Sequence, residues 1–199
     1  MPEGGKTSYG AATPQEEKLM KKVIMVLAPG FEELEAVAVA DLLRRIGVEL
    51  TLAGLGGREI TGAHKMTLTA DVELSMDMGG FDAVVLPGGM PGAANLLASD
   101  AVEKLLRDTA KSGGITAAIC AAPMVLSRAG LLTGKRFTIY PGFETRLNPG
   151  EHPTGAMAER DGNVVTGKGP GAVFAFGGEV AAALGLEREF AEIREGMFF

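Results

Sequence analysis

Short, unbroken apolar runs separated by segments with helical spacing constrain the fold of this chain more than any other feature of its sequence. Residues 23–28 form one such run, which ends at Pro29-Gly30, and residues 33–46 then carry leucine and valine at helical spacing. Strands that are apolar at every position are buried on both faces, as in a parallel sheet covered by helices. We therefore predict an α/β fold, a three-layer α/β/α sandwich around a mostly parallel, doubly wound sheet.

The same criteria place the other elements of the fold. Further strands are predicted at residues 48–53, 83–86, 115–119, 136–139 and 163–166. Further helices are predicted at residues 101–110, 121–129 and 171–184. The first 20 residues lack a hydrophobic signal core and are interpreted as a flexible tail, so residues 21–199 form the single expected domain.

Charge and cysteine content narrow the setting in which the chain works. The formal net charge of −6 gives no basic surface for nucleic acid or for an anionic membrane, and no apolar run reaches membrane-spanning length. A single cysteine excludes an intramolecular disulfide and indicates a reducing, cytoplasmic compartment. One cysteine and two histidines without close spacing predict no metal site. The glycine-rich segments at 54–57 and 167–171 lack the spacing of nucleotide-binding loops, so no cofactor is expected.

That single cysteine, Cys120, falls on the turn between a predicted strand and a predicted helix. The free backbone N–H groups at a helix N-terminus stabilise a thiolate and lower the pKa of a thiol there. Cys120 is therefore a candidate nucleophile. The alternative is that it is a small, inert core residue, which is the commoner role of a lone cysteine.

The carboxyl ends of parallel strands meet at one edge of a sheet, where ligands bind. This rule brings residues 28–35 and Leu86-Pro87-Gly88-Gly89 to Cys120. Gly88 and Gly89 can direct N–H groups at an oxyanion, although Pro-Gly-Gly is equally typical of a plain turn. Most acids at a helix start are solvated caps. Glu35 is the acid that we expect to point inward, where burial beside Cys120 would raise its pKa and suit it to proton transfer.

Four segments resemble, in order and spacing, the DJ-1/PfpI superfamily, and specifically its DJ-1/ThiJ branch: VIMVLAPGFEELEAV, VVLPGGMPGAANL, AAICAAP and GKGPGAVFAF. The resemblance extends from residue 21 to residue 198. It implies a flavodoxin-like sheet of the kind found in class I glutamine amidotransferases, and it implies a homodimer. It also implies that Cys120 is the reactive cysteine and Glu35 its partner carboxyl.

The resemblance assigns further site residues. It implies that the oxyanion donors are the backbone N–H groups of Gly88, Gly89 and Ala121. It also implies that Lys65 lines the pocket and that Arg45 reaches toward a neighbouring subunit. The first predicted helix carries an apolar face around Leu42, Leu43 and Ile46 that we expect to contribute to this subunit contact.

One position departs from the pattern of this branch. Where its best-known member brings a histidine to the cysteine, this chain has Tyr140, and its two histidines lie elsewhere in the sequence. Tyr140 either donates a hydrogen bond to a bound oxygen or covers the pocket floor as an aromatic ring. Cys120 is followed by Ala121, not by the histidine of the protease-like branch, which argues against peptidase activity. The downstream His-x-Glu of glutamine amidotransferases is also missing.

Two functions remain open at this point. The resemblance implies cofactor-free, cysteine-dependent chemistry on a small-molecule aldehyde, either a glyoxalase III-like conversion of methylglyoxal to lactate or a protein deglycase, with a protective role in oxidative stress. The alternative is a redox sensor or chaperone-like stress protein in which Cys120 is oxidised without turnover.

Overall fold

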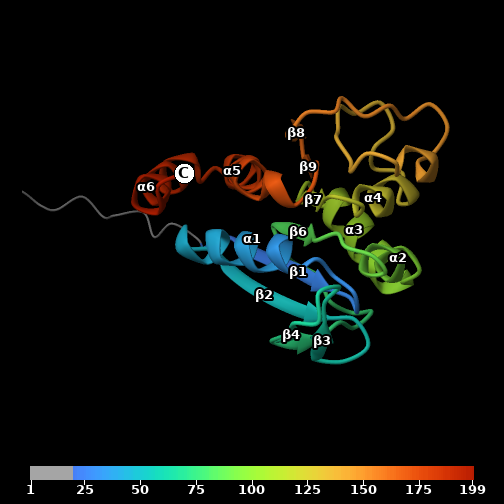
Figure 1. The fold of residues 1–199 in the computed structure, drawn as a ribbon, viewed down its shortest axis with the longest axis horizontal. Coiled ribbons are helices and arrows are strands. Elements are labelled where there is room, and N and C mark those ends of the chain that lie inside the picture. The colour runs from blue at the N-terminus through green and yellow to red at the C-terminus, as the bar shows by residue number, and fades with distance from the viewer. Residues whose placement is uncertain (1–19) are drawn as a thin grey trace, which may run out of the picture.

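The centre of the molecule is a seven-stranded sheet, in which every neighbouring pair except the last is parallel. The computed structural model describes residues 20–199, so the predicted tail lies outside the described residues except for Met20. Figure 1 shows the strands succeeding one another from β2 to β8 across the molecule. Across the sheet the strands are β5 (Val72–Glu73), β2 (Glu49–Gly54), β1 (Lys22–Leu27), β6 (Ala83–Leu86), β7 (Ile115–Ile119), β9 (Val164–Gly167) and β8 (Ala158–Asp161).

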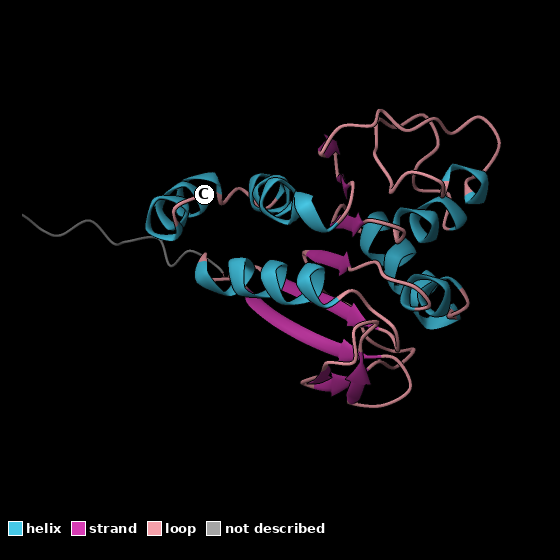
Figure 2. Ribbon diagram, viewed as in Figure 1, coloured by secondary structure: helices cyan, strands magenta, loops and turns pink. Residues whose placement is uncertain are grey.

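Helices cover this sheet in two groups, which makes the fold the expected three-layer α/β sandwich (Figure 2). In one group α1 packs on α5, and α6 packs on α5 in turn; in the other, α2, α3 and α4 contact one another. The helices are α1 (Glu33–Arg45), α2 (Gly92–Leu97), α3 (Asp100–Lys111), α4 (Pro123–Arg128), α5 (Val173–Ala183) and α6 (Glu187–Met197). Short 3₁₀ turns lie at Glu144–Arg146 and Pro170–Ala172. None of the helices in the described part of the chain is long and apolar enough to span a membrane.

The central strands β1, β6 and β7 confirm the prediction from unbroken apolar runs. Every residue of β6 and β7 is buried, as is every residue of β1 after Lys22. These strands form the centre of the core, to which each buried aliphatic side chain contributes about 1.5–3 kcal/mol of transfer free energy. The edge strands β5 and β8 are partly exposed, and β5 is only two residues long.

The strand predicted at residues 136–139 is wrong. Both edges of β9, the strand beside which it would lie, are already paired, with β7 on one side and antiparallel β8 on the other. The segment is instead held by single hydrogen bonds: the Thr138 N–H donates to Thr166 Oγ1, and the Phe137 carbonyl accepts from the Thr154 N–H. It crosses the end of the sheet as a buried connection.

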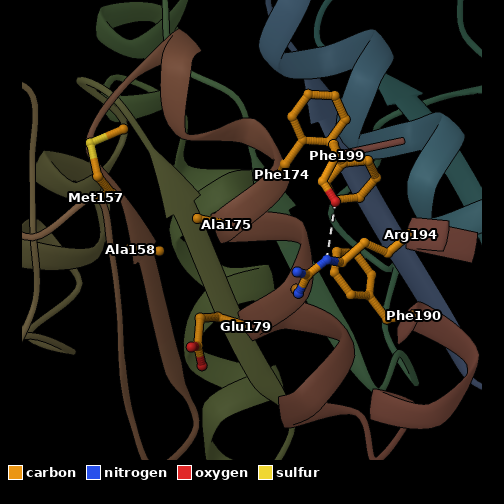
Figure 3. A pocket seen from close by; sticks show the side chains of 9 residues that line it. Met157, Ala158, Phe174, Ala175, Glu179, Phe190, Arg194 and Phe199 are labelled. Atoms are coloured by element: carbon orange, nitrogen blue, oxygen red, sulfur yellow. Dashed lines mark hydrogen bonds between the residues drawn. The ribbon is translucent and has the colours of Figure 1, made fainter. Parts of the chain in front are cut away.

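A small antiparallel hairpin and an aromatic cluster were not predicted from the sequence. Strands β3 (Glu59–Thr61) and β4 (Thr67–Thr69) form the hairpin between β2 and β5. At the other end of the molecule, Phe199 stacks on Phe174 with ring centroids 4.1 Å apart and meets Phe190 edge to face. Figure 3 shows these rings beside Arg194, whose Nε donates to the Phe199 carbonyl at 3.0 Å. The cavity that they line, of about 440 Å³, includes none of the predicted site residues.

Candidate active site

Cys120 occupies a strained turn directly after strand β7. Its φ is +63°, a left-handed conformation that non-glycine residues seldom adopt. Two backbone hydrogen bonds hold this conformation: the Cys120 N–H donates to the Gly167 carbonyl at 2.9 Å, and its carbonyl accepts from the Tyr140 N–H at 2.8 Å. The side chain is 8% exposed. The geometry is that of a nucleophile elbow, in which the turn directs one side chain beyond the end of the sheet.

Glu35 lies beside this thiol and is wholly buried. Its Oε2 accepts the Gly88 N–H at 2.8 Å, and its Oε1 has no hydrogen-bond partner among the described residues. Gly88 is the contact between the two groups, because a Cβ on it would lie 2.6 Å from Cys120 Cβ and 2.9 Å from Glu35 Oε2. Three strand ends therefore meet as expected.

The start of helix α1 fixes the position of Glu35. Glu32 is the N-cap, and its Oε2 accepts the Glu35 N–H at 2.7 Å. The Glu32 N–H in turn donates to the Gly88 carbonyl at 3.0 Å. Both backbone groups of Gly88 therefore bond to helix α1 or its N-cap: its N–H to the Glu35 carboxylate and its carbonyl to the Glu32 N–H. These bonds restrict the position of the Glu35 carboxyl.

Burial dominates the protonation of this pair. It raises the pKa of Glu35 to about 7, although the Gly88 N–H acts to lower it. Burial, together with the Glu35 charge, raises the pKa of the Cys120 thiol to about 12, although the backbone N–H groups of Gly89 and Ala121 act to lower it. Between about pH 7 and pH 12 the pair therefore shares one proton and carries one negative charge.

The lowered thiol pKa expected from a helix N-terminus is a wrong prediction for this structure. Helix α4 begins only at Pro123, is six residues long, and has Ala122 as its N-cap, so Cys120 precedes it by a full turn of chain. The partial charge of a helix end decays within its first turn. Burial outweighs what remains of it.

The predicted oxyanion donors divide into two kinds. The Gly88 N–H donates to Glu35 Oε2, so it positions the carboxylate and is already used as a donor. The N–H groups of Gly89 and Ala121 are directed at the Cys120 sulfur. Gly89 has φ of +86°, and a Cβ there would lie 2.4 Å from the Glu32 nitrogen, so only glycine fits this approach. Oxyanion binding by Gly89 and Ala121 stays a prediction.

Tyr140 borders the site through its backbone, and its side chain is partly exposed. Its ring packs over Gly169, where a Cβ would approach ring carbon Cδ2 to 3.0 Å. The ring lines a cavity of about 500 Å³ together with Pro141, Met157, Lys168, Gly169, Pro170, Gly171 and Ala172. Neither Cys120 nor Glu35 lines this cavity, which is linked to the site through the Tyr140 N–H that donates to the Cys120 carbonyl.

Two further predicted residues, Lys65 and Arg45, lie on the surface. Lys65 is exposed in the turn between β3 and β4, with φ of +72°. Arg45 ends helix α1 and pairs with Asp41 at 2.7 Å on the surface, about 15 Å along the axis from Glu35 at 1.5 Å per residue. The contact of Arg45 with a neighbouring subunit remains a prediction.

The structure brings Glu33 and His64 together next to the site, which sequence reasoning missed. Glu33 was expected to be a solvated cap, yet it is only 3% exposed. Its Oε1 accepts the backbone N–H groups of His64 at 2.6 Å and Met66 at 3.3 Å, and its Oε2 lies 2.8 Å from His64 Nδ1. Burial acts to raise the pKa of Glu33, but these hydrogen bonds outweigh it and the pKa is lowered. No spacing rule connects residues 31 apart on a helix and a hairpin.

Known proteins share this arrangement of elements. The family model described as the DJ-1/PfpI family matches residues 21–183. Protein dj-1beta of Drosophila melanogaster is 37% identical over 182 residues, covering 90% of this chain and 97% of its own length. The crystal structure of Drosophila melanogaster DJ-1beta superposes with a TM-score of 0.85 at 36% identity, covering 90% of this chain and 98% of that one.

Two further relatives have names that state an activity. A deglycase of Pyrococcus abyssi is 34% identical over 159 residues, covering 78% of this chain and 94% of its own. A glutathione-independent glyoxalase of Caenorhabditis elegans is 30% identical over 170 residues, covering 82% and 89%. With the family model spanning most of the chain and the shared fold, the protein belongs to the DJ-1/PfpI family.

Proposed function

We propose that this protein is a cofactor-free enzyme that acts on reactive carbonyl compounds, with Cys120 as nucleophile and Glu35 as proton carrier. The observation that carries the proposal is the contact of the two side chains across Gly88, with Glu35 Oε1 left without a partner. A buried carboxyl oxygen without a hydrogen-bond partner is costly for folding, and a role in proton transfer is one explanation for such an exception. The deglycase and glyoxalase relatives support this choice of substrate class.

The first step forms a carbon–sulfur bond. Glu35 accepts the thiol proton as the sulfur attacks the aldehyde carbon of methylglyoxal, and the aldehyde oxygen becomes an alkoxide. The N–H groups of Gly89 and Ala121, which face the sulfur, are placed to stabilise this charge. Protonation of the alkoxide by Glu35 gives a hemithioacetal.

The second step moves hydrogen between neighbouring carbons. Glu35 removes the proton from the hemithioacetal carbon, and a proton returns to the former ketone carbon through an enediol. The first carbon is oxidised to a thioester and the second is reduced to an alcohol, so no external oxidant is required. Water then cleaves the thioester to release lactate and regenerate the thiol.

Deglycation would use the same intermediate. The Cys120 sulfur would displace an amine from a methylglyoxal adduct, so that a carbon–sulfur bond forms as a carbon–nitrogen bond breaks and Glu35 protonates the leaving amine. We place both activities in a cytoplasmic, reducing setting, because the chemistry needs a free thiol and the chain has a single cysteine.

Turnover of methylglyoxal without added glutathione tests the proposal. Wild-type protein is expected to produce lactate. Cys120→Ser should be inactive, because a serine hydroxyl is harder to ionise than a thiol and a serine alkoxide is a poorer leaving group than a thiolate. Glu35→Gln, which keeps the shape of the side chain, is expected to lose about 10²–10⁴-fold in rate. Absence of lactate from the wild type, or full activity of Glu35→Gln, would contradict the assignment.

The redox-sensor function is the second candidate, supported by the lone cysteine, which has no internal resolving partner. It is less favoured because the two relatives whose names state an activity are a deglycase and a glyoxalase. Mild peroxide followed by peptide mass analysis distinguishes the two. Sulfinic acid at Cys120 before methionine oxidation, in a protein without lactate production, would favour the sensor.

A further inference from the structure

Outside the Cys120–Glu35 pair, the described residues 20–199 contain one cluster of side chains with the composition of a metal-binding site. Glu32, Glu33 and His64 each present one ligand atom, and these atoms all lie within 4.8 Å of one another. We propose that Glu32, Glu33 and His64 bind a divalent transition-metal ion of the Zn²⁺ class. The sequence predicted no metal site, since His64 is 31 residues from Glu33, and only the fold brings them together.

The distances suit a single ion. His64 Nδ1 lies 2.8 Å from Glu33 Oε2 and 3.8 Å from Glu32 Oε1. Ligand atoms around a tetrahedral Zn²⁺, each at about 2.0–2.2 Å, are separated by roughly 3.3–3.6 Å. To bind an ion, the Nδ1–Oε2 distance must widen by about half an ångström and the Nδ1–Oε1 distance must shorten slightly, changes that small side-chain rotations can supply.

Both carboxylates are oriented before any ion arrives. Glu32 uses its Oε2 to accept the Glu35 N–H, and Glu33 uses its Oε1 to accept the N–H groups of His64 and Met66. The opposite oxygen of each, Glu32 Oε1 and Glu33 Oε2, is the one nearest the imidazole. Backbone donors on the outer oxygens of metal-binding carboxylates are the second-shell arrangement that fixes ligand geometry.

The donor chemistry selects the class of ion. One imidazole nitrogen with two carboxylate oxygens suits Zn²⁺, Co²⁺ or Ni²⁺, whereas Ca²⁺ and Mg²⁺ prefer oxygen ligands alone. The His64 imidazole can offer Nδ1 as a ligand in the tautomer that carries its proton on Nε2. Because the imidazole is exposed, an ion can enter from solvent and keep water in its remaining positions.

Metal titration of tag-free protein tests this site independently of any enzymatic activity. The measurement uses a Cys120→Ser background, so that the thiol cannot serve as a ligand, with Zn²⁺ followed by calorimetry and Co²⁺ by visible absorption. One equivalent is expected to bind. His64→Ala and Glu32→Gln, which retains an amide oxygen for the Glu35 N–H, should each raise Kd by about tenfold or more, since even second-shell losses cost that much.

The chain provides a matched control in His152, its only other histidine. His152→Ala should bind Zn²⁺ as the background protein does, and in the NMR spectrum the imidazole signals of His64 alone should shift on Zn²⁺ addition. Circular dichroism confirms that each variant is folded. Equal Zn²⁺ affinity in His64→Ala, a shift of His152 in place of His64, or no binding at all would overturn the site.

Discussion

At the scale of single residues, the site depends on a carboxyl group held without solvent. Glu35 is wholly buried, has one oxygen on the Gly88 N–H, and keeps the other free for Cys120. Burying such a group destabilises the folded state. The same burial suits the group to proton transfer, because it brings the pKa of the carboxyl close to neutral. Catalytic sites commonly retain this kind of destabilising arrangement.

The cost to folding predicts how stability changes with pH. The ordinary pKa of Glu35 is near 4.5 and its folded value is about 7, so below pH 4.5 both states are protonated and no cost arises. As the pH rises from 4.5 to 7, Glu35 ionises in the unfolded state but stays protonated in the folded state. The free energy of unfolding therefore falls by about 3 kcal/mol. Urea unfolding of wild type and Glu35→Gln should show the Gln variant gaining up to that amount at pH 8 relative to pH 4. An equal difference at both pH values would contradict the raised pKa.

Gly88 is the second residue whose identity the site requires. Gly88→Ala would place a Cβ 2.6 Å from Cys120 Cβ, and the resulting displacement should lower turnover by about 10²-fold and stability by about 1–3 kcal/mol. Gly79→Ala is the control, because a Cβ there meets nothing within 4 Å. Steady-state kinetics and thermal unfolding check both variants. Wild-type turnover in Gly88→Ala would show that the contact is not tight.

At the scale of elements, the sequence predicts what is local and misses what depends on distant partners. The unbroken apolar runs identify β6 and β7 to the residue, because their periodicity and burial are properties of the strand itself. The run at 136–139 has similar composition but no free sheet edge to join. Likewise, Glu35 and Cys120 are predicted from strand ends, whereas the Glu33–His64 contact depends on how a hairpin folds back onto α1.

The C-terminal helix α6 depends on one aromatic residue beyond its end. Phe199 stacks on Phe174 of α5, while its neighbour Phe198 is 94% exposed. Phe199→Ala should therefore reduce stability by about 1 kcal/mol and speed hydrogen exchange in α6, since an aromatic pair contributes about 0.5–1.5 kcal/mol beyond its buried area. Phe198→Ala, the same change one residue earlier, should alter neither. Equal effects from the two substitutions would contradict the role of the stack.

At the scale of the whole molecule, the apolar face expected to form a subunit contact needs correction. Leu42, Leu43 and Ile46 are buried within the chain itself. The apolar side chains that helix α1 leaves exposed are Leu34 at 52% and Val37 at 49%. Val37 also lines a groove of about 230 Å³ with Leu52 and Leu68 among its other residues. An exposed apolar surface of this kind is typical of a contact with another chain.

We expect this surface to join two copies of the chain. Light scattering at micromolar concentration should give the mass of a dimer for the wild type. Val37→Asp should give a monomer, because it would bury an unpaired charge in the interface. Met76→Asp, at another exposed apolar residue, is the control and should remain dimeric. A monomeric wild type would refute the expected homodimer.

The two backbone bonds that hold Cys120 also determine when the site can form during folding. They join it to Gly167 and Tyr140, which are 47 and 20 residues later in the chain. Closing loops of that length costs conformational entropy, which is offset only once the strands of the sheet have paired. We therefore expect these contacts to form late in folding. The chain must be synthesised at least as far as β9 before the cysteine is buried, and until then its thiol is exposed like any other. A nascent or partly folded chain therefore has an unprotected thiol without the Cys120–Glu35 contact, and the proposed active site is complete only when folding nears completion.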